Sequence, residues 1–202
     1  MTRTVEFILD VAVPNGYLAW YPLKEIATRT GAELVVTPVF LGGMHKLTGN
    51  APPMFRDADV RGKVEYAQVE FDRFVRRHGL GRFAMHPDLP FNSILPQRCL
   101  VAVDDIDRKA MVGALLPAIW ERNIDCGDET AVMRVLCDAG FDGEEIIERT
   151  RREPVEQRLI DNTSHAVERG AFGIPTFFVD REMWFGKERL GQLESYLKGG
   201  MP

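Results

Sequence analysis

The fold of this chain is decided by one stretch near its C-terminus, Gly173-Ile174-Pro175-Thr176-Phe177-Phe178-Val179-Asp180. Proline has no N–H to donate to a β-ladder, so within sheets it occupies the first residue of a strand, an edge or a bulge. Pro175 stands directly before Thr176 to Val179, a run of β-branched and aromatic residues that favours extended structure. We therefore predict a strand that begins immediately after Pro175.

Gly-x-Pro-Thr ahead of such a strand is where thioredoxin-like folds carry a cis-proline. A cis bond before Pro175 would leave the backbone N–H and C=O of Ile174 free to pair with a thiol peptide lying alongside. The alternative is an ordinary trans proline at a strand start, since only about 5–6% of X-Pro bonds are cis. The tetrapeptide alone does not decide between them, so the rest of the chain must supply the other half of a site.

Composition is that of an ordinary soluble globular protein, with 45% hydrophobic and 27% charged residues in a chain of 202. A net charge of -5 gives no electrostatic footprint for nucleic acid or an anionic membrane. No run approaches the ~18 apolar residues that span a bilayer, and the N-terminus lacks the apolar segment of a signal peptide. We expect a cytoplasmic protein without nucleic-acid or membrane partners.

The cysteines and histidines do not indicate a disulfide framework or a metal site. No two cysteines form a Cys-x-x-Cys pair, and the histidines lack the spacing of metal ligands. The residues in question are Cys99, Cys126, Cys137, His45, His78, His86 and His165. We therefore expect no bound metal, and reduced thiols.

The first forty residues predict a strand, a helix and a second strand. Val5 to Leu9 is the first strand, Gly16 to Thr30 is a helix that Gly31 ends, and Glu33 to Phe40 is the second strand. Strands joined by a crossover helix of about four turns pair in parallel. This part of the chain is therefore a βαβ unit.

A long helical block separates this unit from the proline-led strand. The Gly/Pro-rich segment Leu41 to Pro53 is predicted to be a loop, and loops of this length in compact domains are usually functional. Apolar spacing and capping residues then predict helices over Val60 to His78, Asn92 or Ser93 to Val103, Asp107 to Glu121 with an interruption at Pro117, Glu129 to Ala139, from Asp142 onward, and Pro154 to Arg169.

The chain ends with Thr176 to Val179, a hairpin partner at Met183 to Phe185, and a helix from Lys187 to Lys198. The order β-α-β, helical block, β-β-α is that of an α/β thioredoxin-like fold with a large all-helical insertion. We expect residues 1–41 and 166–202 to form the thioredoxin-like domain and residues 42–165 to form the insertion. The insertion should pack over the strand face and close one side of a pocket near Pro175.

The chain resembles a family at this point, the 2-hydroxychromene-2-carboxylate isomerases and their kappa-class glutathione transferase relatives of the DsbA-like thioredoxin superfamily. The resemblance covers nearly the whole chain. It is carried by Asp10, Pro14 and Tyr17-Leu18-Ala19, by Lys46-Leu47-Thr48-Gly49-Asn50-Ala51-Pro52-Pro53, by Pro90-Phe91-Asn92-Ser93, by Phe172 to Val179, and by Met183-Trp184-Phe185-Gly186-Lys187-Glu188-Arg189-Leu190.

The resemblance implies a glutathione site on the thioredoxin face. The cysteinyl backbone of glutathione would pair with Ile174, the residue before Pro175. Its γ-glutamyl end would lie at the start of the last helix, where Lys187 stands and Glu188 can pair with the ammonium. The alternative for Glu188 is a first-turn acid that only complements the helix dipole.

Further residues would complete the site. The resemblance places Lys46 and Asn50 on the same pocket, the lysine to stabilise a thiolate or carboxylate and the asparagine to give a directed hydrogen bond. Asn92 and Trp184 are expected to border a pocket for an aromatic substrate, with core packing as the alternative for Trp184.

One position departs from the family pattern. Relatives carry Ser-Pro-x-Ser at the start of the first helix, where the first serine hydrogen-bonds the glutathione sulfur, and disulfide oxidoreductases carry Cys-x-x-Cys. Here the four residues are Val13-Pro14-Asn15-Gly16, so dithiol chemistry is excluded at this place. A helix end contributes about 0.3–1 kcal/mol to a thiolate and one charge-assisted hydrogen bond about 1.5–3. Asn15 or Lys46 is therefore the expected replacement at the catalytic position of Val13.

The sequence thus predicts a glutathione-dependent isomerase of small aromatic compounds, with glutathione as cofactor. The resemblance implies a homodimer. Two alternatives stay open: a kappa-class-like glutathione transferase or peroxidase, and a thioredoxin-like glutathione-binding protein that lacks catalysis because of Val13.

Overall fold

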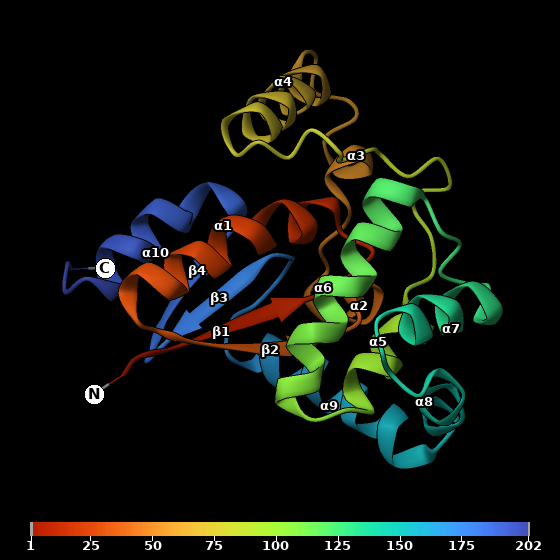
Figure 1. The fold of residues 1–202 in the computed structure, drawn as a ribbon. Helices are drawn as coiled ribbons and strands as arrows, with labels where there is room; N and C mark the ends of the chain where they lie inside the picture. The colour runs from red at the N-terminus through yellow and green to blue at the C-terminus, as the bar shows by residue number, and fades with distance from the viewer. Residues whose placement is uncertain (1, 202) are drawn as a thin grey trace.

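A four-stranded mixed sheet forms the centre of the protein (Figure 1). The structure is a computed structural model that describes residues 2–201. The sheet has the order β2-β1-β3-β4, formed by β1 (Thr4–Leu9), β2 (Glu33–Pro38), β3 (Thr176–Val179) and β4 (Glu182–Phe185). Strands β1 and β2 run parallel, as predicted for a βαβ unit, and β3 is antiparallel to β1 and β4.

Helix α1 (Pro14–Thr30) connects β1 to β2, and the helical block lies between β2 and β3. The block consists of α2 (Leu41–Thr48), α3 (Pro53–Arg56), α4 (Lys63–Arg77), α5 (Ile94–Val101), α6 (Asp105–Arg122), α7 (Glu129–Asp138), α8 (Gly143–Thr150) and α9 (Glu153–Glu168). A 3₁₀ turn, Lys187–Arg189, and α10 (Leu190–Leu197) end the chain. This order confirms the thioredoxin-like fold with an inserted helical segment.

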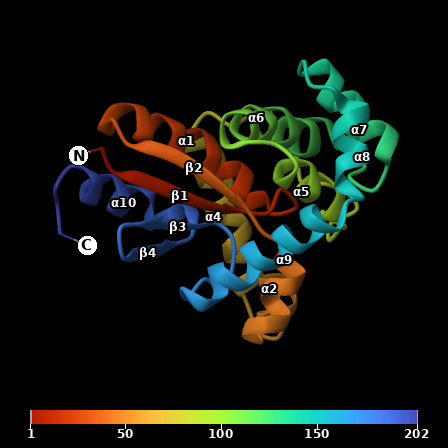
Figure 2. The ribbon, with the colours of Figure 1, turned by 90° about the horizontal axis from the view of Figure 1, so that it is seen from below.

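The two faces of the sheet are covered by different helices (Figure 2), since alternate side chains of a strand point to opposite faces. On one face Phe7 stacks on Trp20 of α1 and on Phe177 of β3, with ring centroids 6.2 and 5.4 Å apart. On the other face Ile8 and Phe178 belong to a buried cluster that includes side chains of α2 and α9. Helices α1 and α6 therefore lie across the sheet from α2 and α9.

The main core runs through the thioredoxin-like part and the helical block without a break. Phe7 and Leu18 belong to the same buried cluster as Leu115 and Trp120 of α6. The division into residues 1–41 with 166–202 and residues 42–165 stays a prediction, because the two parts share this core.

Helix α4 stands away from the rest of the molecule (Figure 1). None of its residues is fully buried, although Phe71, Phe74 and Val75 pack against the main core. The ring of Phe71 lies 5.4 Å from that of Phe83, between centroids, and this contact joins α4 to the aromatic residues around Trp120.

The predicted loop from Leu41 to Pro53 was wrong, because most of it is α2. The backbone N–H of Leu41, at the start of α2, donates to Asp10 Oδ2 at 2.8 Å, so the cap comes from a residue 31 positions away. The ring of Phe40 lies across the first turn, and a Cβ on Gly42 would be 2.8 Å from it. The glycines that indicated a loop are thus packing residues of a helix.

Two further helices differ from the prediction. Pro117 does not split its helix, since α6 continues from Asp105 to Arg122 and its packing in the core outweighs one missing hydrogen bond. The C-terminal helix begins as the 3₁₀ turn at Lys187 and becomes α-helical only at Leu190. No helix within residues 2–201 is long and apolar enough to cross a bilayer.

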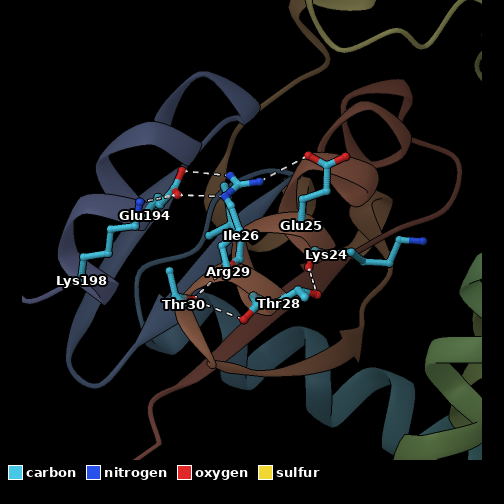
Figure 3. Close-up of polar contacts among 9 residues, drawn as sticks. Lys24, Glu25, Ile26, Thr28, Arg29, Thr30, Glu194 and Lys198 are labelled. Atoms are coloured by element: carbon cyan, nitrogen blue, oxygen red, sulfur yellow. Dashed lines mark hydrogen bonds and ion pairs between the residues drawn. The ribbon is translucent and has the colours of Figure 1, made fainter.

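An ion-pair network joins α1 to α10 on the surface (Figure 3). Arg29 donates from Nε and Nη2 to the two carboxylate oxygens of Glu194, at 3.2 and 3.1 Å. Lys198 lies 2.8 Å from the same carboxylate, and Glu25 accepts from Arg29 at 3.4 Å. The hydrogen bond from Arg29 and then that from Lys198 lower the pKa of Glu194 to about 2.

We expect Glu194→Gln to lower the free energy of unfolding at pH 7 by about 0.5–1 kcal/mol, because water screens a pair whose Arg29 side chain is 49% exposed. A depressed carboxyl pKa stabilises the folded state above the unfolded pKa of about 4.3, and this contribution is lost as pH falls toward 2. Urea unfolding of wild type and variant at pH 7 and at pH 2 measures the stability difference and its dependence on pH. Glu25→Gln is the control, with an expected change of a few tenths of a kcal/mol. A wild-type advantage that persists at pH 2 would contradict the assignment.

Candidate active site

The loop between β1 and α1 presents a helix N-terminus without a side-chain cap. Val13 is the N-cap residue in an extended conformation (φ -107°, ψ 116°), and Pro14 follows at the first helical position. The N–H of Gly16 donates to Val13 O at 2.9 Å, whereas the N–H of Asn15 has no partner among residues 2–201. The side-chain Oδ1 of Asn15 is buried and also lacks a partner within these residues. This helix end therefore offers one free donor, the N–H of Asn15, and one unsatisfied acceptor, its Oδ1.

The peptide bond between Ile174 and Pro175 is cis, which confirms the expectation from the Gly-x-Pro-Thr motif. Pro175 O accepts from Gly186 N at 2.9 Å, so the loop is bonded to the start of the C-terminal 3₁₀ turn. Neither the N–H nor the C=O of Ile174 has a hydrogen-bond partner in the described part of the chain. An extended peptide laid beside Ile174 could use both groups.

Val13 and Ile174 belong to the same buried apolar cluster, together with Met44 of α2. Val13 is 9% exposed and Ile174 is 5% exposed. Gly16 allows this close approach, because a Cβ at that position would lie 2.8 Å from Leu9 Cδ1 and 3.7 Å from Ile174 Cγ2. The structure thus places the start of α1 directly beside the cis-proline loop.

Helix α2 carries Lys46 and is followed by Asn50, and it packs against the cluster that contains Val13 and Ile174. Lys46 is exposed and has no ion-pair or hydrogen-bond partner within residues 2–201. The amide of Asn50 is already used: Nδ2 donates to Phe172 O at 2.7 Å, and Oδ1 accepts from Ala51 N at 2.9 Å. Asn50 therefore ties the end of α2 to the backbone two residues before Ile174.

Lys187 and Glu188 form an ion pair at the start of the C-terminal turn. The Lys187 side chain is 4% exposed, and its Nζ lies 5.1 Å from the ring centre of Phe71 and 5.2 Å from that of Phe74. Glu188 is 54% exposed and folds back over Gly186, where a Cβ would lie 2.7 Å from Oε2. The predicted γ-glutamyl partners are thus together, with the lysine covered by α4.

A surface cavity of about 590 Å³ adjoins this ion pair, between α1, α4 and α10. Its floor is apolar, and its rim carries charges of both signs. The lining residues include Ile26, Phe74, Leu190, Arg73, Arg77 and Glu188.

Asn92 and Trp184 make contacts of their own, outside the cluster that Val13 and Ile174 form. Asn92 is exposed, and its Oδ1 accepts from Ile94 N at 2.9 Å, so it caps α5. Trp184 is 6% exposed and lies in the main core, with its ring centre 5.1 Å from that of Tyr196. The predicted pocket wall at Trp184 was therefore wrong, and core packing, the alternative, accounts for this tryptophan.

Two buried polar side chains beside the site had no role in the sequence prediction. Gln97 of α5 is fully buried, and its Nε2 donates to Leu9 O at 2.8 Å and Val39 O at 2.6 Å. Asp10 is 1% exposed, and its Oδ1 accepts from Ala12 N at 3.0 Å. Only the position of Asp10 at a strand end signalled such a role, and no local signal marked Gln97.

The thiols nearest the core cannot serve as nucleophiles. Burial raises the pKa of Cys99 and of Cys126 to about 12, so both are neutral at physiological pH. Within the described residues, no group of three or more His, Cys, Asp or Glu side chains is arranged to hold a metal ion.

A cis-proline ahead of β3, beside the N-terminus of α1, is the arrangement that the thioredoxin-like fold predicts. Residues 4–198 match the family model of the DSBA-like thioredoxin domain, and the chain belongs to this family. The match confirms the superfamily that the sequence motifs indicated.

Individual relatives show which proteins of this family the chain is similar to. The chain is 29% identical to the 2-hydroxychromene-2-carboxylate isomerase of Sphingobium xenophagum, over 98% of this chain and 99% of the relative. It is 27% identical to human glutathione S-transferase kappa 1, over 98% of this chain and 92% of the relative. A solved structure of 2-hydroxychromene-2-carboxylate isomerase superposes with a TM-score of 0.83 at 27% identity, covering 96% of this chain and 94% of the other. The predicted resemblance to these isomerases and transferases is confirmed.

We expect Gly16→Ala to lower the free energy of unfolding by about 1–3 kcal/mol, because the new methyl would overlap Leu9, which is fully buried. Gly113→Ala in α6 is the matched control, since nothing lies within 4 Å of a Cβ there and alanine favours a helix. Urea unfolding of both variants checks the difference. Equal stability of the two variants would show that α1 can shift away from the cis-proline loop at no cost.

Proposed function

We propose that the protein is a glutathione-dependent isomerase of small aromatic compounds, of the 2-hydroxychromene-2-carboxylate type. The observation that carries the proposal is the unpartnered backbone of Ile174 beside the cis-proline, facing the N-terminus of α1. Relatives of this name at 27–29% identity, over nearly the full chain, support the reaction class.

The site fits a cysteinyl peptide in three respects. The N–H and C=O of Ile174 can pair with the cysteinyl backbone as one rung of an antiparallel ladder. The free N–H of Asn15 and the positive end of the α1 dipole follow Val13, which packs with Ile174, and they favour an anion. Glu188 and Lys187 carry the charges that the γ-glutamyl ammonium and carboxylate would meet.

Bound glutathione would supply a thiol that adds reversibly to a conjugated double bond, allows rotation about the resulting single bond, and leaves unchanged. The protein's part is to hold that thiol as a thiolate and to exclude water around it. The side-chain amide of Asn15 can donate only through Nδ2, since its buried unsatisfied atom is the acceptor Oδ1, and Lys46, which has no partner in residues 2–201, can offer its charge to the sulfur or to a substrate carboxylate. Val13, which is 9% exposed, can supply part of an apolar wall, and the fully buried Met44 packs in the same cluster.

Opening of the ring C–O bond of the cyclic hemiketal 2-hydroxychromene-2-carboxylate, followed by this rotation, would give trans-o-hydroxybenzylidenepyruvate, and the reverse steps would re-form the hemiketal. Two observations favour alternatives. The kappa-class relatives support a glutathione transferase or peroxidase, and Val13 in place of the family's serine supports a glutathione-binding protein without catalysis. A homodimer and a cytoplasmic location also stay predictions, and sedimentation equilibrium of the wild-type protein checks the first.

Calorimetric titration with glutathione and an isomerase assay on trans-o-hydroxybenzylidenepyruvate test the proposal. We expect wild type to bind and turn over, and Glu188→Gln to weaken glutathione binding by about tenfold, or about 1.4 kcal/mol. Glu144→Gln, at the first turn of α8, is the matched control for a dipole effect and should leave binding unchanged. Absence of binding by wild type would overturn the proposal. Binding without isomerisation, but with electrophile conjugation, would favour the transferase.

Val13→Ser should restore a hydroxyl donor near the sulfur and lower the pKa of the bound thiol by about one to two, from a charge-assisted hydrogen bond of about 1.5–3 kcal/mol. The ultraviolet absorbance of the thiolate against pH, with both proteins saturated with glutathione, measures this pKa. Ala12→Ser adds the same hydroxyl one residue earlier and serves as the control. A thiol that titrates no lower in Val13→Ser would show that Val13 does not face the sulfur.

A further inference from the structure

A single buried carboxylate joins three segments that surround the candidate site. Asp10 follows directly after β1 and is 1% exposed. Its Oδ1 accepts from Ala12 N at 3.0 Å, and its Oδ2 accepts from Leu41 N at 2.8 Å. A third neighbour is Ser93, at the start of α5, whose side chain favours the charged form of the carboxylate.

Two of these neighbours belong to segments with a role in the proposed function. Ala12 precedes Val13 in the loop that leads to Asn15, and Leu41 is the first residue of α2, which carries Lys46. Helix α2 leads to Asn50, whose amide holds the carbonyl of Phe172 at 2.7 Å, ahead of Ile174. A continuous path of hydrogen bonds and backbone therefore runs from Asp10 through α2 to the cis-proline loop.

The side chain at this position must accept two backbone N–H groups at once. A carboxylate offers two acceptor oxygens, whereas an asparagine amide would turn an NH₂ group toward one of the two donors. Burying this carboxylate also costs free energy. No cation within residues 2–201 lies within ion-pair distance of Asp10, and burial raises the pKa of its carboxyl despite three neighbours that favour the charged form.

We propose that Asp10 is a positioning residue of the glutathione site, which sets the placement of α2, with Lys46 and Asn50, relative to the loop that carries Asn15. The inference rests on the proposed function. Asp10 does not touch glutathione. Its effect on binding passes through Leu41 and α2, and therefore depends on the residues that α2 carries.

Asp10→Asn is the direct test. We expect the Kd and the KM for glutathione to rise by about tenfold, from the loss of one charged hydrogen-bond acceptor. Asp104→Asn is the matched control, because Asp104 also accepts two backbone N–H groups, from Ile106 and Asp107 at 3.1 and 3.0 Å, at the remote N-terminus of α6. That variant should bind glutathione as wild type does.

A double-mutant cycle with Asn50→Ala separates positioning from general stability. If Asp10 acts through α2, the effect of Asp10→Asn on the Kd should shrink to about twofold or less when Asn50 is already alanine. Additive effects, or an unchanged Kd in Asp10→Asn while wild type binds glutathione, would overturn the inference and leave the proposed function intact. Failure of wild type to bind would overturn both. If Asp10→Asn does not fold, Ser93→Ala runs in the same cycle, with a smaller non-additive effect expected and additivity again counting against the inference.

Discussion

Backbone polar groups at the carboxyl ends of β1 and β2 leave the sheet in a buried region, where every unpaired N–H or C=O would cost stability. Side chains of the helical block supply their partners. Gln97 donates to Leu9 O and Val39 O and accepts from Val11 N at 3.3 Å, and Trp120 Nε1 donates to Val11 O at 2.8 Å. Helices α5 and α6, folded against the β1–α1 loop, therefore help to hold its conformation.

The helical block therefore shapes the β1–α1 loop in addition to contributing Met44 and Asn50 close to Ile174. In a smaller thioredoxin-like chain, water or local turns would satisfy these strand ends. Here a glutamine and a tryptophan, both contributed by the block, do so in the dry interior. As a consequence, two large side chains with polar ends occupy core positions, and their polar atoms are hydrogen-bonded to backbone groups.

Local patterns predicted the parts of the fold that depend on neighbouring residues. Alternating and 3.6-residue periodicity gave the strands and most helices, and Pro175 with its flanking residues gave the cis-proline loop. The prediction missed α2 because the acceptor for Leu41 N is Asp10, in another segment of the chain. It misplaced Trp184 because strand alternation does not say which face of the sheet is solvated, and β4 turns this residue toward α10. For the site, the motif positions at Val13, Asn15 and Ile174 come together in space, whereas the buried contacts of Lys187 could not be foreseen.

The position of α4 gives the molecule two regions of very different local stability. The helix buries none of its residues fully and is attached mainly through Phe71 and Phe74. A segment with so few buried contacts opens at a free energy far below that of global unfolding. Each such opening removes both aromatic faces from Lys187 Nζ and lets water reach an ammonium whose side chain is otherwise 4% exposed. The surroundings of the charge at one end of the proposed glutathione site thus depend on the packing of one peripheral helix, while the cis-proline loop at the other end lies in a buried cluster.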